Sequence, residues 1–471
     1  MKSREDLDVA LVMCPGWGVE YPPVGISYLS GFLKRKGINA KCFDFNIEFY
    51  KLCREKEYWN LNSPEYFIVP DLFKKNIFPK VEPFIEKWAV QILADNPKIV
   101  GFSLFMPTVN ISLLLAAQLK KLKKELIVIG GGPEVTRIKR VVYDKIRRFA
   151  FINEEVLTGF DILVDGEGED SLWEVVHSLR CKSGYGKIAG IIFKADDISI
   201  VNKPRSLMAG LDDLPAGDFD DYCLKDYTRS VLPIVTSRGC VNRCTFCADS
   251  PLWKSYRSRS PEKVVAEIMH LSGRYKRKGF EICDSTLNGD TGRVEKICDL
   301  IIKLKLKIKW SGKATLNKRM NYDLLCKMKE AGCVSLGYGV ESASAAVLRD
   351  MCKNIDITEA ARIIRDTYRA GIEANCFFLI GYPSETEADF RLTLDFIKDN
   401  AAFINCFDQI TGCHLEEDSY LGRNIGKYGI VFKEDGWHSR ESTPEIRRER
   451  LQRFKELAGK LHEHYKCEVQ L

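Results

Sequence analysis

Three closely spaced cysteines are the residues of this sequence best suited to chemistry. Cys240, Cys244 and Cys247 stand at spacings of four and three residues, directly after an apolar run at 231–236. That run is short, β-branched and bounded by turn residues, so it predicts a strand with the cysteines on the loop that leaves it. Three thiolates on a tight loop can bind three irons of a [4Fe–4S] cube, and the fourth iron stays open to a small molecule.

A zinc site and a chance grouping are the alternatives for this triplet. Zinc is usually held by four ligands, often from two Cys-x-x-Cys pairs, and the sequence offers no fourth ligand near the triplet. Arg238 and Arg243 flank the cysteines, and we expect their charge to lower the thiol pKa values and favour ligation. A second cluster, built from Cys376, Cys406 and Cys413, would lack the tight spacing of such sites.

The triplet resembles the signature of radical S-adenosylmethionine (radical SAM) enzymes, because the spacing is C-x3-C-x2-C and Phe246 precedes the third cysteine. The resemblance implies a [4Fe–4S] cluster held by Cys240, Cys244 and Cys247. It also implies that the methionine part of SAM chelates the open iron, and that reductive cleavage of SAM gives a 5′-deoxyadenosyl radical.

The composition is that of a globular protein without a membrane segment. The chain has 471 residues, which at about 150 residues per domain suggests roughly three domains. It is 45% hydrophobic and 29% charged, and it contains neither an apolar run of membrane length nor an N-terminal signal core. We therefore expect a cytoplasmic protein. A net charge of +6 without a concentrated basic patch does not favour nucleic-acid binding, and the 17 cysteines are not expected to form disulfides there.

Ahead of the triplet, apolar runs alternate with amphipathic segments. The strands are expected at 8–14, 39–45, 98–104, 126–129 and 161–164, with an aromatic-rich insertion at 47–97. This alternation predicts an α/β fold with a doubly wound parallel sheet. Ligands of such sheets bind beyond the carboxyl ends of the strands, and glycine-rich turns fall at those ends here.

These turns resemble the cobalamin-binding domain of cobalamin-dependent radical SAM enzymes. The residues that carry this resemblance, and to which it assigns cobalamin contacts, are Tyr21, Pro22, Gly25, Ser103, Gly130, Gly131, Gly132, Gly166 and Glu167. In many cobalamin proteins an Asp-x-His-x-x-Gly motif supplies the lower axial histidine. Because Pro22 stands at the place of that histidine, the resemblance implies base-off cobalamin without a protein histidine on cobalt.

After the connector, alternation resumes with strands expected at 231–236, 279–284, 308–314, 333–341, 374–381 and 403–411. Six such units predict a partial (β/α)6 barrel, with its site at the carboxyl ends of the strands. The expected domains are a cobalamin-binding domain at 1–185, a turn-rich connector at 186–229, the barrel at 230–411, and a helical tail covering the barrel at 412–471.

Polar residues and glycines stand at several of these strand ends. By the radical SAM resemblance, Asp284 faces the amino group of SAM, Lys313 its carboxylate, Glu341 and Ser342 the ribose, and Ile380 with Gly381 the adenine. Asn288 and Gly339 belong to the same strand-end motifs. Solvated loop residues and helix caps are the alternative interpretation.

Together these resemblances predict a radical SAM enzyme that uses cobalamin to methylate an unactivated carbon of an unknown small molecule or natural product. A radical cyclase or rearrangement enzyme without methyl transfer is one alternative, and a non-catalytic cobalamin or redox sensor is another. An electron donor such as flavodoxin or ferredoxin is the expected protein partner. No nucleic-acid or membrane partner is expected.

Overall fold

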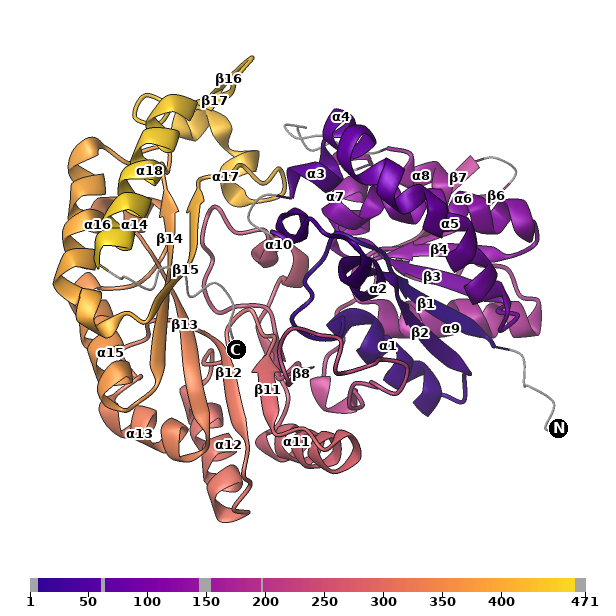
Figure 1. The fold of residues 1–471 in the computed structure, drawn as a ribbon, viewed down its shortest axis with the longest axis horizontal. Helices are drawn as coiled ribbons and strands as arrows, with labels where there is room; N and C mark the ends of the chain where they lie inside the picture. The colour runs from indigo at the N-terminus through magenta and orange to yellow at the C-terminus, as the bar shows by residue number, and fades with distance from the viewer. Residues whose placement is uncertain (1–6, 61–63, 144–153, 196–197, 462–471) are drawn as a thin grey trace. The chain divides into compact units, whose positions relative to one another are not determined.

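The computed structural model describes residues 7–60, 64–143, 154–195 and 198–461. The chain forms two compact units (Figure 1). The first contains nearly all of the described residues before 231. The second contains the residues from 231 onward, together with 210–212.

The described residues of the first unit form a seven-stranded sheet in the order β2-β1-β3-β4-β5-β6-β7. The first five strands are parallel: β1 (Val9–Met13), β2 (Ala40–Asp44), β3 (Ile99–Ser103), β4 (Ile127–Gly131) and β5 (Ile162–Val164). All five residues of β1 are buried, as expected for a parallel strand covered on both faces. The predicted doubly wound sheet is confirmed.

Helices connect these strands and supply the core around them. The longer ones are α1 (Val24–Arg35), α2 (Phe45–Leu52), α5 (Phe78–Leu93), α6 (Val109–Leu122), α7 (Pro133–Val142) and α9 (Gly168–Cys181). The insertion at 47–97 is rich in aromatic residues because it builds its own core. There the Trp88 ring stacks on Phe45 at 4.8 Å between centroids and meets Phe49 edge-on at 6.2 Å.

The stretch expected to be a turn-rich connector, 186–229, includes two strands of the first sheet. Strands β6 (Ile191–Ala195) and β7 (Ile198–Val201) extend the first sheet in antiparallel fashion. Beyond them, the Tyr227 hydroxyl donates to Asp44 at 2.7 Å, so this stretch packs on the first unit. Both strands are short, yet they carry apolar residues that the interpretation as a connector overlooked, Ile191, Ile192 and Phe193 in β6 and Ile198, Ile200 and Val201 in β7.

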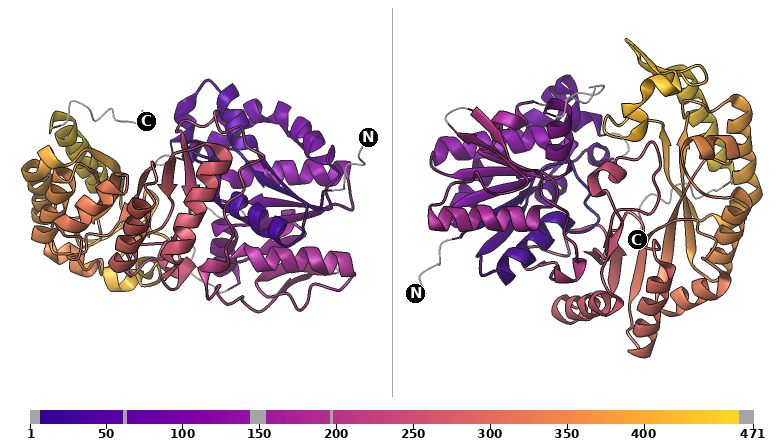
Figure 2. Two further views of the ribbon diagram at one scale, coloured as in Figure 1. Left: turned by 90° about the horizontal axis from the view of Figure 1, so that it is seen from below. Right: turned by 180° about the vertical axis from the view of Figure 1, so that it is seen from behind.

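The second unit is built on a six-stranded parallel sheet in the order β15-β14-β13-β12-β11-β8, with β15 and β8 at its edges. The strands are β8 (Val231–Ile234), β11 (Gly279–Ile282), β12 (Lys309–Ala314), β13 (Cys333–Glu341), β14 (Glu373–Ile380) and β15 (Cys406–Gly412). The helices between them are α11 (Pro261–Tyr275), α12 (Thr291–Lys303), α13 (Tyr322–Glu330), α14 (Ala345–Asp350), α15 (Ile357–Arg369) and α16 (Glu387–Asn400). They lie along the outside of the curved sheet (Figure 2). The predicted partial barrel is confirmed.

The tail differs in part from the expectation. Helix α18 (Pro444–Leu461) packs against β14, β15 and α16. Phe454 is fully buried there, 5.0 Å from the ring of Phe378 and 5.8 Å from that of Phe407. This helix therefore covers the helical face of the sheet, where the helix following β15 belongs, and not the mouth. The apolar spacing of the sequence predicts this helix to about residue 465, and the part beyond Leu461 lies outside the described residues.

Candidate active site

The cysteine loop leaves β8 and is bracketed by two short antiparallel strands, β9 (Ser237–Arg238) and β10 (Arg257–Ser258). Gly239 turns the chain into the loop with φ +80°, and a side chain there would clash with the carbonyl of Ser255. Cys240, Cys244 and Cys247 are all half-buried on this loop, at the carboxyl end of the first barrel strand.

The electrostatic expectation for the thiols needs a correction. Burial raises the pKa of Cys240, that of Cys244 to about 11 and that of Cys247 to about 12. The cation that lowers the pKa of Cys240 and Cys244 is Lys353. The predicted Arg243 instead donates to Ser250 and to the carbonyl of Lys254.

Thr245 anchors the loop to three other segments. Its amide donates to the carbonyl of Met351 at 2.8 Å, its hydroxyl pairs with that of Tyr382 at 2.8 Å, and its carbonyl accepts from the amide of Leu421 at 2.7 Å. Phe246 packs beside it on a buried cluster formed by Val347, Met351, Leu379, Tyr382, Cys413, Leu421, Ile430 and Trp437. The tail thus helps to hold the cysteine loop through residues 413–437.

Asp284 belongs to a buried frame behind the loop. Its carboxylate accepts from the Thr236 amide at 2.7 Å, the Thr236 hydroxyl at 2.5 Å and the Ser237 hydroxyl at 2.6 Å. Burial raises its pKa, against the lowering effect of these hydrogen bonds and of Arg293. Both carboxylate oxygens are therefore engaged by the strand end that leads to the cysteines. Contact with the SAM amino group stays a prediction.

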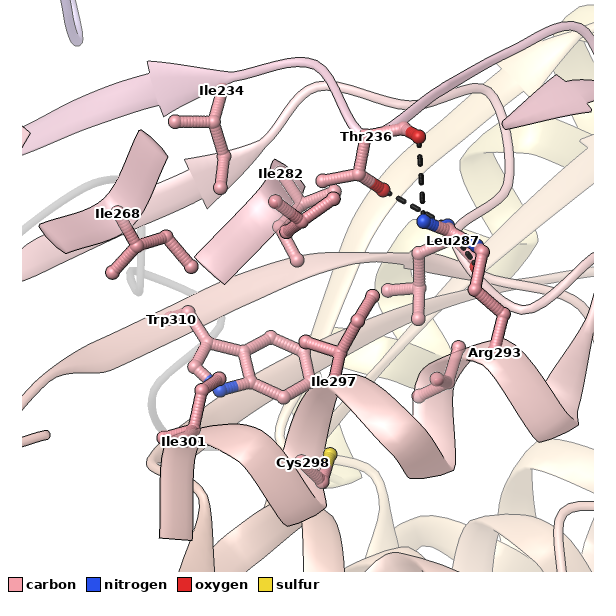
Figure 3. A pocket seen from close by; sticks show the side chains of 12 residues that line it. Ile234, Thr236, Ile268, Ile282, Leu287, Arg293, Ile297, Cys298, Ile301 and Trp310 are labelled. Atoms are coloured by element: carbon pink, nitrogen blue, oxygen red, sulfur yellow. Dashed lines mark hydrogen bonds between the residues drawn. The ribbon is translucent and has the colours of Figure 1, made fainter. Parts of the chain in front are cut away.

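Arg293 of α12 completes this frame. Figure 3 shows its guanidinium reaching Thr236, whose hydroxyl accepts at 3.0 Å and whose carbonyl accepts at 3.3 Å. The pocket beside it is lined by Ile234, Val264, Ile268, Ile282, Leu287, Val294, Ile297, Cys298, Ile301 and Trp310 as well as these two residues. Because nearly all of this lining is apolar, the pocket belongs to the packing of sheet on helices.

Asn288 ties two neighbouring strand ends together. Its side-chain oxygen accepts from the Thr315 amide at 2.8 Å, and its side-chain amide donates to the Thr315 carbonyl at 2.8 Å. Asn288 is fully buried, so in the described structure it braces the ends of β11 and β12.

Glu341 ends β13 in an unusual conformation. Its φ is +67°, and the pairing with β14 shifts register beside it. Its carboxylate lies 2.7 Å from the ammonium of Lys353. Gly339 provides the space for this pair, because a side chain at position 339 would clash with both groups. Strained backbone of this kind clusters at functional sites. Sequence reasoning missed Lys353, which carries no local signal beyond following a short helix.

Ser342, Ile380 and Gly381 complete the expected SAM contacts in this unit. Ser342 is fully buried and accepts from the amide of Ser344 at 3.1 Å, in the way of a local turn. Gly381 has φ +77°, its amide donates to Glu385 at 2.8 Å, and its carbonyl accepts from Ser442 at 2.7 Å. Glu385 and Ser442 therefore fix the strand end to which the adenine contact is assigned.

In the first unit, the residues predicted to bind cobalamin come to one edge of the sheet. They lie at or just after the carboxyl ends of β1, β3, β4 and β5, beside the point between β1 and β3 where the winding reverses. Pro22 is buried and Gly25 is exposed, with the Ser103 hydroxyl 3.9 Å from where a side chain on Gly25 would begin.

Three further features shape this edge. Trp17 stacks on Phe105 with centroids 3.7 Å apart, which joins the loop after β1 to the loop after β3. Gly132 has φ +110°, and a side chain there would lie 2.7 Å from the carbonyl of Leu104. Glu167 accepts from the amide of Met208 at 2.6 Å. The edge offers glycine-lined backbone and apolar surface, which fits a large flat cofactor.

Neither a compact group of metal ligands nor a membrane-length helix occurs in the described residues. They contain no group of three or more His, Cys, Asp or Glu side chains close enough to hold a single metal ion. Within the same ranges, no helix is long and apolar enough to cross a membrane.

Residues 234–397 match the family model of the Radical SAM superfamily. The barrel of this chain therefore belongs to the Radical SAM superfamily. Membership implies a [4Fe–4S] cluster and SAM, and the cysteine loop lies inside the matched range.

Known proteins resemble this radical SAM chain over most of its length. An uncharacterised methyltransferase of Pyrococcus horikoshii is 27% identical over 70% of this chain and 69% of its own. An anaerobic magnesium-protoporphyrin IX monomethyl ester cyclase of Rubrivivax gelatinosus is 22% identical over 80% of this chain, which spans 62% of the cyclase.

The same fold occurs in the radical SAM methyltransferase TsrM of Kitasatospora setae, solved with cobalamin and a [4Fe–4S] cluster bound. The match has a TM-score of 0.68 at 15% identity and covers 91% of this chain and 80% of TsrM.

Proposed function

We propose that this radical SAM enzyme uses cobalamin to methylate an unactivated carbon of a small molecule. The observation that carries the proposal is the pairing, in one chain, of a radical SAM cysteine loop with a sheet edge lined by Gly25, Gly131 and Gly132. The methyltransferase relative and the fold shared with TsrM support it.

In this proposal Cys240, Cys244 and Cys247 hold the cluster, which supplies the electron that cleaves SAM. Glu341, held by Lys353, orients the ribose hydroxyls, and Gly381 presents its backbone to the adenine. The protein contributes binding, orientation and exclusion of water, while the cofactors supply the radical and methyl-transfer chemistry. A flavodoxin or ferredoxin is the proposed electron donor.

The first unit would hold cobalamin against its glycine-lined edge, with Pro22 where other cobalamin proteins place a histidine. Reconstitution with hydroxocobalamin should therefore give a base-off absorption spectrum. A chain that retains no cobalamin would contradict this part of the proposal.

A radical cyclase is the second candidate, favoured by the likeness to the Rubrivivax gelatinosus cyclase. A non-catalytic sensor is less well supported, because a sensor has no need of the buried Glu341–Lys353 pair beside the cysteine loop.

The products of SAM separate these functions. Methylation consumes two SAM per product, one giving 5′-deoxyadenosine and the other S-adenosylhomocysteine. The test is an anaerobic turnover with methyl-labelled SAM and a cell extract as substrate source, followed by chromatography of both nucleosides. Equal amounts, with label in a small molecule, are expected. Extract-dependent 5′-deoxyadenosine without S-adenosylhomocysteine would favour the cyclase.

A further inference from the structure

The inner face of the second unit's sheet is polar where a packed barrel would be apolar. On β12, Trp310, Gly312 and Ala314 are buried, and Trp310 contributes to the apolar packing against α12. The alternate residues Ser311 and Lys313 face the other way. A closed βα barrel fills that inner face with branched apolar side chains. Polar residues at this face therefore indicate that a ligand binds there.

Two pairs of polar side chains on this face form hydrogen bonds with each other. The Ser311 hydroxyl donates to Glu281 at 2.5 Å, which joins β12 to β11. The Asn375 side-chain amide donates to the Ser335 hydroxyl at 2.9 Å, which joins β14 to β13. The side-chain oxygen of Asn375 has no hydrogen-bond donor among the described groups.

Lys313 differs from these pairs. It is exposed although β12 is an interior strand of the sheet, and no carboxylate of the described residues lies within ion-pair distance of its ammonium. That ammonium lies 5.7 Å from the centroid of the Phe377 ring. The ring in turn packs on Gly337, where a side chain would begin 2.6 Å from the ring edge. Glycine thus makes room for an aromatic surface beside an unpaired cation.

The position of Lys313 along the strands separates it from the Glu341–Lys353 pair. Lys313 lies opposite Gly337 in the β12–β13 register, four residues before Glu341. At about 3.3 Å per residue this is roughly 13 Å along the strand, away from its carboxyl end. Lys313 is also the next-to-last residue of β12, so a group bound to it lies below Glu341 but within about two residues of the levels of Asp284 and Thr315.

We propose that Lys313 and Phe377 form a substrate subsite for an anionic group, a carboxylate or phosphate, attached to a flat or apolar portion. The ammonium binds the anion, and the Phe377 ring packs against the apolar portion. This inference rests on the proposed function and replaces the SAM carboxylate as the partner of Lys313.

A direct binding measurement tests the subsite without turnover. The probe is 4-fluorobenzoate, an aromatic carboxylate, titrated into the cluster-loaded full chain and followed by fluorine NMR. Lys313→Met should weaken its binding at least fivefold, whereas Lys307→Met, at an exposed lysine just before the same strand, should not change it. Equal binding by the wild type and Lys313→Met would overturn the proposal.

Turnover gives the second test. With methyl-labelled SAM and cell extract, the labelled product should be retained on an anion exchanger, and Lys313→Met should form it at least tenfold more slowly. SAM affinity and extract-independent SAM cleavage should change less than twofold, and Lys313→Arg should recover a third or more of the labelling.

Loss of SAM affinity in Lys313→Met would assign the lysine to SAM, and a neutral product would also overturn the subsite. A wild type that cleaves SAM but transfers no label would instead contradict methyl transfer, and the benzoate titration then decides on the subsite.

Discussion

The ammonium of Lys353 lies 2.7 Å from the carboxylate of Glu341, and both side chains are largely buried, at 9% and 14% exposed. Burial disfavours the Lys353 ammonium, but the charge of Glu341 raises its pKa above the usual value. The lysine therefore stays charged and connects the residue predicted to hold the ribose with the cysteine loop.

Replacing Lys353 by Met should destabilise the second unit and reduce its iron content. The variant leaves the Glu341 carboxylate largely buried without a cation, and breaking such a pair costs about 3–5 kcal/mol. Calorimetry and iron quantification after anaerobic reconstitution measure both effects. The double variant Glu341→Gln/Lys353→Met should recover part of the lost stability. A Lys353→Met protein with unchanged melting temperature and iron would contradict this account.

Single replacement of Cys240, Cys244 or Cys247 by Ala should abolish the cluster, because each thiolate binds one iron. Cys283→Ala is the matched control: this half-buried cysteine lies just beyond β11, outside the triplet. Iron quantification and electron paramagnetic resonance of the reduced protein should show loss in the three variants and full content in the control. Full iron in any triplet variant would remove that cysteine from the ligand set.

The strands and the cysteine loop could be predicted because their signals are local. Parallel strands buried on both faces are short apolar runs, as in β1, and the spacing of the three cysteines is itself the motif. The first and second sheets follow from that alternation. Strands β6 and β7 were missed although both carry apolar residues, because they are only five and four residues long and stand in a stretch rich in polar and turn-forming residues.

The partners of the site residues could not be predicted because they depend on long-range contacts. Nothing near Lys353 in the sequence indicates its pairing with Glu341. From the sequence, Asp284 looks like an unpaired polar residue at a strand end. In the structure its carboxylate accepts hydrogen bonds from Thr236 and Ser237, which lie more than 40 residues earlier in the chain. The hydrogen bond from the Leu421 amide to the Thr245 carbonyl likewise forms only when the tail folds back onto the second unit.

Gly132→Ala should weaken cobalamin binding and lower stability. At φ +110° a side chain is strained, at a cost of about 1–3 kcal/mol, and it would push against the backbone of Leu104 at the edge predicted to hold the cofactor. Gly186→Ala is the control, since that exposed glycine has open space around it. Titration with hydroxocobalamin should show weaker binding for Gly132→Ala alone. Equal affinities for both variants would place the cofactor elsewhere.

Glu385 should make the stability of the second unit depend on pH. Burial raises its pKa to about 7 from 4.5, against the lowering effect of the Gly381 amide and the Arg450 guanidinium. Because the folded chain holds this proton more tightly than the unfolded chain, the stabilisation is present below about pH 4.5. It is lost as the pH rises through 7, by roughly 3 kcal/mol in all.

Glu385→Gln should remove this dependence, because the amide cannot ionise and can still accept from the Gly381 amide. At pH 5 the melting temperature of the wild type should therefore equal or exceed that of the variant. Between pH 5 and pH 8 the difference in melting temperature should shift in favour of the variant. Glu434→Gln, at an exposed carboxylate of the tail, should follow the wild type at every pH. A melting-temperature difference between wild type and Glu385→Gln that stays constant from pH 5 to pH 8 would mean that Glu385 does not titrate in this window.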